Sequence, residues 1–172
     1  MSGPAPQTAF VDVFLLLRDA QGRLLFGLRA DHLYAGGRWN LVSGKVDEGE
    51  DVITAVIREA REEVGLALRP EDVTPRGVVH IHPRDGRPRV GFAFLAEHSP
   101  VRHGEVANAE PDKCDRLLWA NPAHPPEPLE AYNAAVLTIL SGQAVVVVRG
   151  WHDDPVDQVP LGGQGLEAMP VT

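Results

Sequence analysis

The segment from residue 44 to residue 66 constrains this chain most, because it requires a helix with one acidic and one apolar face. Glu59, Glu62 and Glu63 fall at positions i, i+3 and i+4, so on a helix their side chains share one face. Carboxylates this close repel one another. A hard divalent cation prefers oxygen ligands, and an ion placed between the carboxylates would offset their repulsion. The arrangement therefore predicts a magnesium or manganese site.

The same segment carries an apolar stripe at helical spacing. Its members are Ile53, Val56, Ile57, Ala60 and Val64. One side of the helix can then pack on a core while the acidic edge borders a cleft. Gly65 suits a left-handed C-terminal cap, and Glu50 and Asp51 favour a helix start near those residues. Residues 44–49, with two glycines, predict a loop that can approach a ligand closely.

The whole segment resembles the Nudix box, G-x5-E-x7-R-E-U-x-E-E-x-G-U, in which U is a bulky aliphatic residue. The positions that match are Gly44, Glu50, Arg58, Glu59, Glu62, Glu63, Gly65 and Leu66. Ala60 is smaller than the first U, and Ser43 stands where many family members have glycine. The resemblance covers about residues 8–142. It implies an α/β fold, with a mixed β-sheet between helices in an α/β/α sandwich.

The resemblance also implies an activity and a set of roles. Nudix enzymes are hydrolases that use a divalent metal, Mg²⁺ or Mn²⁺, to cleave a diphosphate linked to another group. By resemblance, the expected metal site comprises Glu59, Glu62, Glu63 and Gly44. Arg58, Glu59 and Glu62 are expected to take part in catalysis.

Arg58 has two interpretations. At i, i+4 from Glu62 it can form an ordinary helix salt bridge, worth about 0.3–0.5 kcal/mol. The resemblance implies instead that Arg58 holds Glu50 of the loop and orients the metal-binding carboxylates, and we favour this role. A glutamate-rich helix face is usually solvated surface, but here the glutamates accompany a glycine loop at fixed spacing.

A second acidic segment lies shortly before Trp119. Several Nudix enzymes carry a further carboxylate in this region, as a metal ligand or a base, and Glu110 matches best by position. Glu105 and Asp112 are alternatives, and a solvated loop acid is an equally good interpretation. Trp119 is expected in the core rather than stacked on a base. Cys114 is expected to be an inert packed thiol, since no activating partner is evident.

Four residues outside the helix are candidates for substrate binding. Arg29 ends a predicted strand and can meet phosphates or form a surface salt bridge; Arg38 and Lys45 are similar candidates. His80 and His82 alternate on one strand and face the same side, so His80 lines either the cleft or a polar outer face. Neither histidine suits the hard metal ion expected here.

Composition and charge argue against several classes of function. A chain of 172 residues with 44% hydrophobic residues fits one domain with a core. The net charge of −8 argues against general nucleic-acid or anionic-membrane binding. No apolar run approaches the roughly 20 residues of a membrane span, and the N-terminus lacks the features of a signal peptide. With a single cysteine, the chain is expected in the cytoplasm, acting on a small phosphorylated substrate.

Hydrophobic patterning predicts the order of the elements. The predicted strands are 10–17, 23–29, 39–42, 77–82, 90–96 and 117–119, with a second helix over 129–140. The domain is expected to span residues 8–142, followed by an extension over 143–172 with a strand at 145–148 and a loosely packed tail. Exposed, such an apolar strand would invite aggregation, so it must pair with its own sheet or with a second chain; we favour a homodimer slightly.

Three functions share this fold. The first is a metal-dependent hydrolase acting on a nucleoside diphosphate derivative or a nucleoside triphosphate. The second is an isopentenyl-diphosphate isomerase, but Cys114 falls outside the early strand where such enzymes need a cysteine. The third is a non-catalytic nucleotide-binding module, which tends to lose the box glutamates that are all present here.

Overall fold

The eight strands of the described chain form one mixed sheet. The computed structural model describes residues 3, 5–83, 86–142 and 145–151. The strands are β1 (Phe10–Arg18), β2 (Leu24–Arg29), β3 (Trp39–Asn40), β4 (Val42–Lys45), β5 (Thr74–Ile81), β6 (Arg89–Glu97), β7 (Cys114–Ala120) and β8 (Val146–Arg149). Their order is β3-β2-β1-β6-β5-β8, with β4 paired to β1 and β7 paired to β2. The helices are α1 (Val52–Val64), α2 (Pro100–His103) and α3 (Ala131–Leu140), with a 3₁₀ turn, η1, at Pro70–Asp72.

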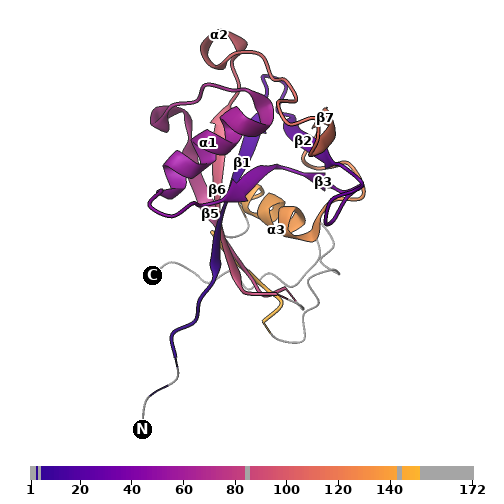
Figure 1. Ribbon diagram of the computed structural model, residues 1–172. Helices are drawn as coiled ribbons and strands as arrows, with labels where there is room; N and C mark the ends of the chain where they lie inside the picture. The colour runs from indigo at the N-terminus through magenta and orange to yellow at the C-terminus, as the bar shows by residue number, and fades with distance from the viewer. Residues whose placement is uncertain (1–2, 4, 84–85, 143–144, 152–172) are drawn as a thin grey trace.

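Helices α1 and α3 cover opposite faces of this sheet (Figure 1). Each face of the sheet has its own hydrophobic core. Strand β1 contributes to both, because its successive side chains point to opposite faces. Val13 and Leu15 pack with the buried side of α1, whereas Phe14 and Leu16 pack with α3. The predicted α/β/α sandwich is therefore confirmed.

Helix α1 begins and ends as the sequence predicts. Asp51 caps its start by accepting hydrogen bonds from the amides of Ile53 at 2.8 Å and Thr54 at 3.0 Å. Gly65 ends it in the left-handed conformation, with φ of 71°. The buried stripe comprises Ala55, Val56, Ala60 and Val64. The prediction that Ile53 belongs to this stripe is wrong: it lies about 200° around the helix from Ala55 and is 37% exposed.

The predicted loop at the start of the box is shorter than expected. Residues 44 and 45 belong to β4, where Ser43 and Gly44 lie opposite Phe14 and Val13 of β1 in antiparallel register. Strand β1 offers backbone hydrogen-bonding groups on this edge, and extending β4 satisfies them. Gly44 is therefore held on a strand directly beside α1.

The predicted strand after the last helix joins the chain's own sheet. Strand β8 pairs in parallel with β5, placing Val147 beside Val79, and Val147 is fully buried. The predicted loosely packed tail lies, from residue 152 on, outside the described residues. Within the described residues, no helix is long and apolar enough to cross a membrane.

Candidate active site

Arg58 lies at the centre of an ionic network that joins α1 to the preceding loop. Its Nε and Nη2 donate to the two carboxylate oxygens of Glu50 at 2.9 and 3.0 Å, and Nη1 donates to Glu59 at 2.7 Å and Glu62 at 3.0 Å. Nη2 also donates to the carbonyl oxygen of Lys45 at 2.9 Å. The predicted contact with Glu50 is confirmed, and the ordinary helix salt bridge to Glu62 coexists with it. Hydrogen bonding to Arg58 lowers the pKa of Glu50.

Gly44 provides the space that the Glu59 carboxylate occupies. A Cβ atom at position 44 would lie 1.9 Å from Glu59 Oε1, far inside van der Waals contact. Any side chain here would push the carboxylate away. Glu59 is thereby held between Arg58 and β4, and burial raises its pKa although the Arg58 guanidinium opposes the rise.

Glu63 differs from Glu62, its neighbour, in where its carboxylate lies. Glu63 Oε2 accepts a hydrogen bond from the backbone amide of Ser43 at 3.2 Å, so it faces β4. Burial first, and the Glu59 carboxylate second, raise the pKa of Glu63 to about 8. The Glu62 side chain is 44% exposed. The inward pair of box glutamates is therefore Glu59 and Glu63.

Glu110 is brought to Glu63 by a loop fastened to the last turn of α1. The amide of Ala109 donates to the carbonyl oxygen of Glu63 at 3.0 Å, and the amide of Glu110 donates to Asn108 Oδ1 at 3.2 Å. The Glu110 carboxylate pairs with Lys113 Nζ at 2.6 Å. This hydrogen bond raises the pKa of Lys113.

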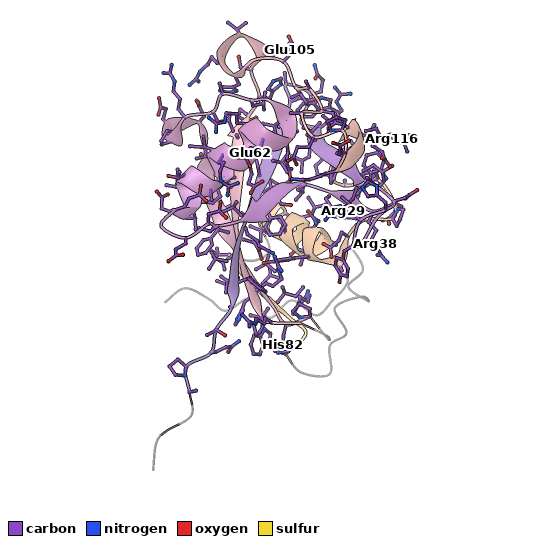
Figure 2. The ribbon with its side chains drawn as sticks, in the orientation of Figure 1. Arg29, Arg38, Glu62, His82, Glu105 and Arg116 are labelled. Carbon is purple, nitrogen blue, oxygen red and sulfur yellow. The ribbon has the colours of Figure 1, made fainter. Side chains whose placement is uncertain are left out.

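The two alternatives to Glu110 lie elsewhere. Glu105 and Asp112 are exposed and do not line the pocket that Glu110 and Glu63 share. Figure 2 shows Glu105 near α2, well away from Glu62. Of these three acids, Glu110 is the one that lines the pocket with Glu63.

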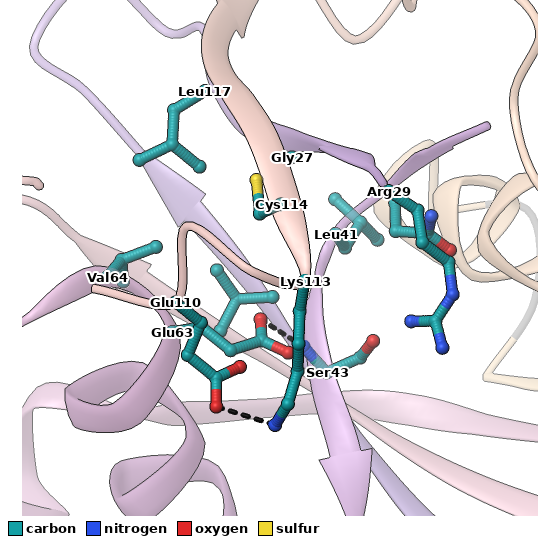
Figure 3. Close-up of a pocket in the computed structure, with 12 residues that line it drawn as sticks. Gly27, Arg29, Leu41, Ser43, Glu63, Val64, Glu110, Lys113, Cys114 and Leu117 are labelled. Carbon is teal, nitrogen blue, oxygen red and sulfur yellow. Dashed lines mark hydrogen bonds and ion pairs between the residues drawn. The ribbon is translucent and has the colours of Figure 1, made fainter. Parts of the chain in front are cut away.

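A pocket of about 560 Å³, its open mouth included, adjoins these carboxylates (Figure 3). Its lining residues are Gly27, Arg29, Asn40, Leu41, Val42, Ser43, Glu63, Val64, Glu110, Lys113, Cys114 and Leu117. They come from β2, β3, β4, β7, the end of α1 and the loop before β7, with Leu41 between β3 and β4, so sheet, helix and loop close the pocket together. The acidic cluster lies at one side of it, and Arg29 and Lys113 supply positive charge.

Of the four predicted substrate-binding residues, Arg29 lines the pocket. Its Nε donates to the carbonyl oxygen of Tyr34 at 2.7 Å, which orients the guanidinium. Arg38 is exposed and does not line this pocket.

Lys45 and His80 lie away from the pocket. The ammonium of Lys45 lies over the Phe10 ring, 5.1 Å from its centroid. The His80 ring packs against Trp151 with 4.5 Å between centroids, and His82 contacts the same indole. Figure 2 shows His82 far below Arg29. The histidines therefore belong to an aromatic cluster on β5 rather than to the described pocket.

Cys114, predicted to be an inert packed thiol, is partly buried and lines the pocket. Its Sγ would be 3.1 Å from a Cβ at position 27, so Gly27 makes room for it. The thiol donates to the carbonyl oxygen of Arg116 at 3.3 Å, and burial raises its pKa, which agrees with an unreactive thiol. Trp119 is partly buried against the core beneath α1, close to its predicted place.

The donor chemistry of the cluster fits a hard divalent cation. Glu59, Glu63 and Glu110 present carboxylate oxygens, the ligands that magnesium and manganese prefer. Among the described residues, no three acidic, histidine or cysteine side chains form a preassembled metal site. Arg58 and Lys113 instead neutralise carboxylates of the cluster.

Sequence reasoning missed several residues of the pocket, notably Lys113, Asn40 and Ser43. Ser43 immediately precedes the box, and Lys113 follows Glu110 by three residues. Both were therefore near predicted site residues. Their participation depends on the pairing of β4 with β1 and of β7 with β2, which sequence spacing does not determine.

Comparisons of the chain with known proteins agree on one family. A family model of the NUDIX domain matches residues 8–140. The chain is 44% identical over 74 residues to an RNA pyrophosphohydrolase of Gluconacetobacter diazotrophicus, covering 37% of this chain and 44% of that protein. It is 28% identical over 112 residues to the CTP pyrophosphohydrolase of Escherichia coli, covering 65% of this chain and 76% of that protein. It thus spans less than half of the first relative.

A solved structure shows the same likeness. The MutT NUDIX hydrolase of Burkholderia pseudomallei superposes with a TM-score of 0.67 at 31% sequence identity, over 78% of this chain and 99% of that chain.

Proposed function

The chain belongs to the Nudix family, and we propose that it is a hydrolase that cleaves a diphosphate linkage in a nucleoside diphosphate derivative or a nucleoside triphosphate. One observation carries the proposal: Glu63 of α1 and Glu110 of a separate loop line one pocket together with Arg29 and Lys113, and the Glu59 carboxylate is near enough to both glutamates for their charges to interact. The pyrophosphohydrolase names of the relatives support the same reaction class.

The proposal includes Mg²⁺ or Mn²⁺ as cofactor, held by Glu59 and Glu63 with Glu110 nearby. When bound, the metal would neutralise phosphate charge and lower the pKa of a coordinated water. We assign Glu62 no direct contact with the metal, because its side chain is 44% exposed and pairs with Arg58. We further propose a small phosphorylated substrate, a cytoplasmic location and a domain spanning residues 8–142.

Residues of the chain then position the substrate and accept the proton of the attacking water. Water attacks one phosphorus of the bridge, the P–O bond to the bridging oxygen breaks, and the proton of the water passes to a carboxylate. We propose Glu110 as the acceptor, because its carboxylate lines the pocket in which the substrate would bind. Arg58 keeps the Glu59 carboxylate in place throughout. Arg29 and Lys113 are placed to bind phosphate oxygens.

The test is a substrate panel incubated with Mg²⁺, with products separated by ion-exchange chromatography. It should include nucleoside triphosphates, oxidised purine nucleotides, nucleotide sugars, ADP-ribose and 5′-triphosphorylated RNA. Isopentenyl diphosphate belongs in the panel because Cys114 lies in the pocket with Glu110. We expect hydrolysis of at least one nucleotide. Double-bond migration, or tight binding without turnover across the panel, would contradict the proposal in favour of the isomerase or the binding module.

A further inference from the structure

Lys113 forms an ion pair with Glu110 in the pocket beside the acidic cluster. Its Nζ lies 2.6 Å from Glu110 Oε1, and both residues line the pocket together with Glu63 (Figure 3). The Lys113 side chain is 63% exposed, against 25% for Glu110. The ammonium is therefore held by charge at the pocket mouth, with little packing around its stem.

The loop that carries Glu110 is anchored by bonds other than those of the Lys113 side chain. The loop is fastened by backbone bonds from Ala107 to the carbonyl oxygen of Val64 at 3.2 Å and from Ala109 to that of Glu63 at 3.0 Å. Asn108 closes the loop by donating to the carbonyl oxygen of Cys114 at 2.6 Å. The ion pair is thus an addition to a loop that is already anchored, which separates its electrostatic role from a structural one.

The two cations beside the cluster are held very differently. Arg58 makes five hydrogen bonds to Glu50, Glu59, Glu62 and the Lys45 carbonyl, so it is fixed. Lys113 makes one side-chain bond, to Glu110. A divalent cation that binds Glu110 competes with an ammonium whose flexible four-carbon stem lets it move elsewhere in the pocket.

We propose that Lys113 is an exchangeable counter-ion. Its ammonium pairs with the Glu110 carboxylate until a divalent cation binds there, and it then pairs with a phosphate of the substrate. This inference rests on the proposed function, since it supposes that the cluster takes a metal. It assigns Lys113 a positioning role that couples the two binding events. Arg29, fixed by Tyr34, cannot make this exchange with Glu110 in the same way.

The exchange predicts effects of opposite sign for one substitution. Without the competing ammonium, Lys113→Met should bind Mn²⁺ roughly 2- to 5-fold more tightly, the factor that corresponds to an exposed ion pair. Without the phosphate contact, the same variant should bind a diphosphate about tenfold more weakly, as expected for a lost charge-assisted hydrogen bond. A merely structural lysine would weaken both or neither.

The experiment measures free Mn²⁺ by electron paramagnetic resonance at low salt, where exposed charges act most strongly. Wild type, Lys113→Met and Lys113→Arg are titrated with Mn²⁺ alone. They are then titrated with methylenediphosphonate, a non-hydrolysable diphosphate, at saturating Mn²⁺. Arg76→Met is the matched control, because it removes one positive charge from an exposed position on β5 that does not line the pocket; both affinities should stay at the wild-type value.

A double-mutant cycle tests whether Lys113 acts through Glu110. Lys113→Met should tighten Mn²⁺ binding much less in a Glu110→Gln background than in the wild type, and Lys113→Arg should restore most of the diphosphate affinity. Equal or weaker Mn²⁺ binding by Lys113→Met, while the wild type binds Mn²⁺, would overturn the counter-ion role and leave the proposed function standing. A wild type that binds no Mn²⁺ would overturn both.

Discussion

At the scale of single residues, the three box glutamates have three different surroundings. Their shared helix face follows from sequence spacing, and so does the partnership of Arg58 with Glu50 that the family motif implies. Sequence spacing does not determine which carboxylates point inward, because this depends on the Ser43 amide and on the space at Gly44. The choice of Glu110 likewise depends on backbone bonds between two segments far apart in sequence.

Replacing Glu63 should change how stability depends on pH in the metal-free protein. The folded pKa of Glu63 is raised to about 8, above its unfolded value, so the folded state holds a proton that the unfolded state loses. Stability then falls as pH rises from the unfolded pKa towards 8. Glu63→Gln should remove this fall and be more stable by on the order of 1–3 kcal/mol at pH 8. Urea unfolding in EDTA at pH 5 and pH 8 measures it.

Glu62→Gln is the matched control for that measurement, since it makes the same change at the exposed neighbouring position. Its stability difference from wild type should vary little between the two pH values. If Glu63→Gln behaves like Glu62→Gln, the buried, protonated carboxyl inferred for Glu63 is wrong.

Gly44→Ala tests the space beside Glu59. The added methyl would overlap the carboxylate, so Glu59 must turn away from its place while the strand persists. Turnover should fall about 10- to 100-fold, the cost of a displacement near 1 Å, with the unfolding midpoint little changed. Gly86→Ala, whose methyl meets nothing closer than 3.5 Å, should keep full activity. Unimpaired turnover in Gly44→Ala would show that Glu59 needs no such space.

At the scale of elements, the patterns that depend on near neighbours were predicted best. The caps of α1, with Asp51 and Gly65, and the strands β1, β2, β5 and β6 lie close to their predicted places. Strand β4 reaches further into the box than expected, because pairing with β1 is a tertiary interaction. Ile53 fits the helical period yet is exposed, since the position of the sheet decides which part of the helix is buried.

Val147 of β8 and Val145, the residue just before this strand, form a matched pair of valines. Val147 is fully buried and Val145 is 56% exposed, so the same substitution tests packing in one and not in the other. Val147→Ala should destabilise the protein by about 1–3 kcal/mol, and Val145→Ala by less than about 0.5 kcal/mol. Urea unfolding followed by tryptophan fluorescence measures both. Equal effects would contradict the pairing of β8 with β5 in this sheet.

At the scale of the whole molecule, the resemblance of one motif implied the sandwich, and the structure confirms it. Nothing in a single sequence could place the pocket among β2, β4, β7 and α1, because it depends on which strands meet. Two side chains that were both candidates for substrate binding, Arg29 and Lys45, lie on different parts of the molecule for the same reason. The pairing of β8 likewise resolves one of two arrangements that the sequence left open.

A homodimer through the outer edge of β8 stays a prediction. Val148 is 37% exposed on this strand, which comes last in the sheet order of the described chain. Light scattering at high micromolar concentration should then give the mass of two chains, and Val148→Lys should give one, because a charge on an edge strand opposes pairing. A single-chain mass for the unmodified protein would leave only the pairing within the chain.

The most direct test of the metal-dependent hydrolase is the turnover of Glu63→Gln on the best substrate of the panel, at saturating Mg²⁺. The substitution keeps the size of the side chain and removes its charge, so a metal ligand is lost while the fold persists. We expect kcat to fall by about 10²-fold or more, as for the loss of a preorganised electrostatic interaction. Glu71→Gln, an exposed glutamate outside the pocket, should match the wild type. Near-normal turnover by Glu63→Gln with an unchanged Mg²⁺ requirement would contradict the proposed active site.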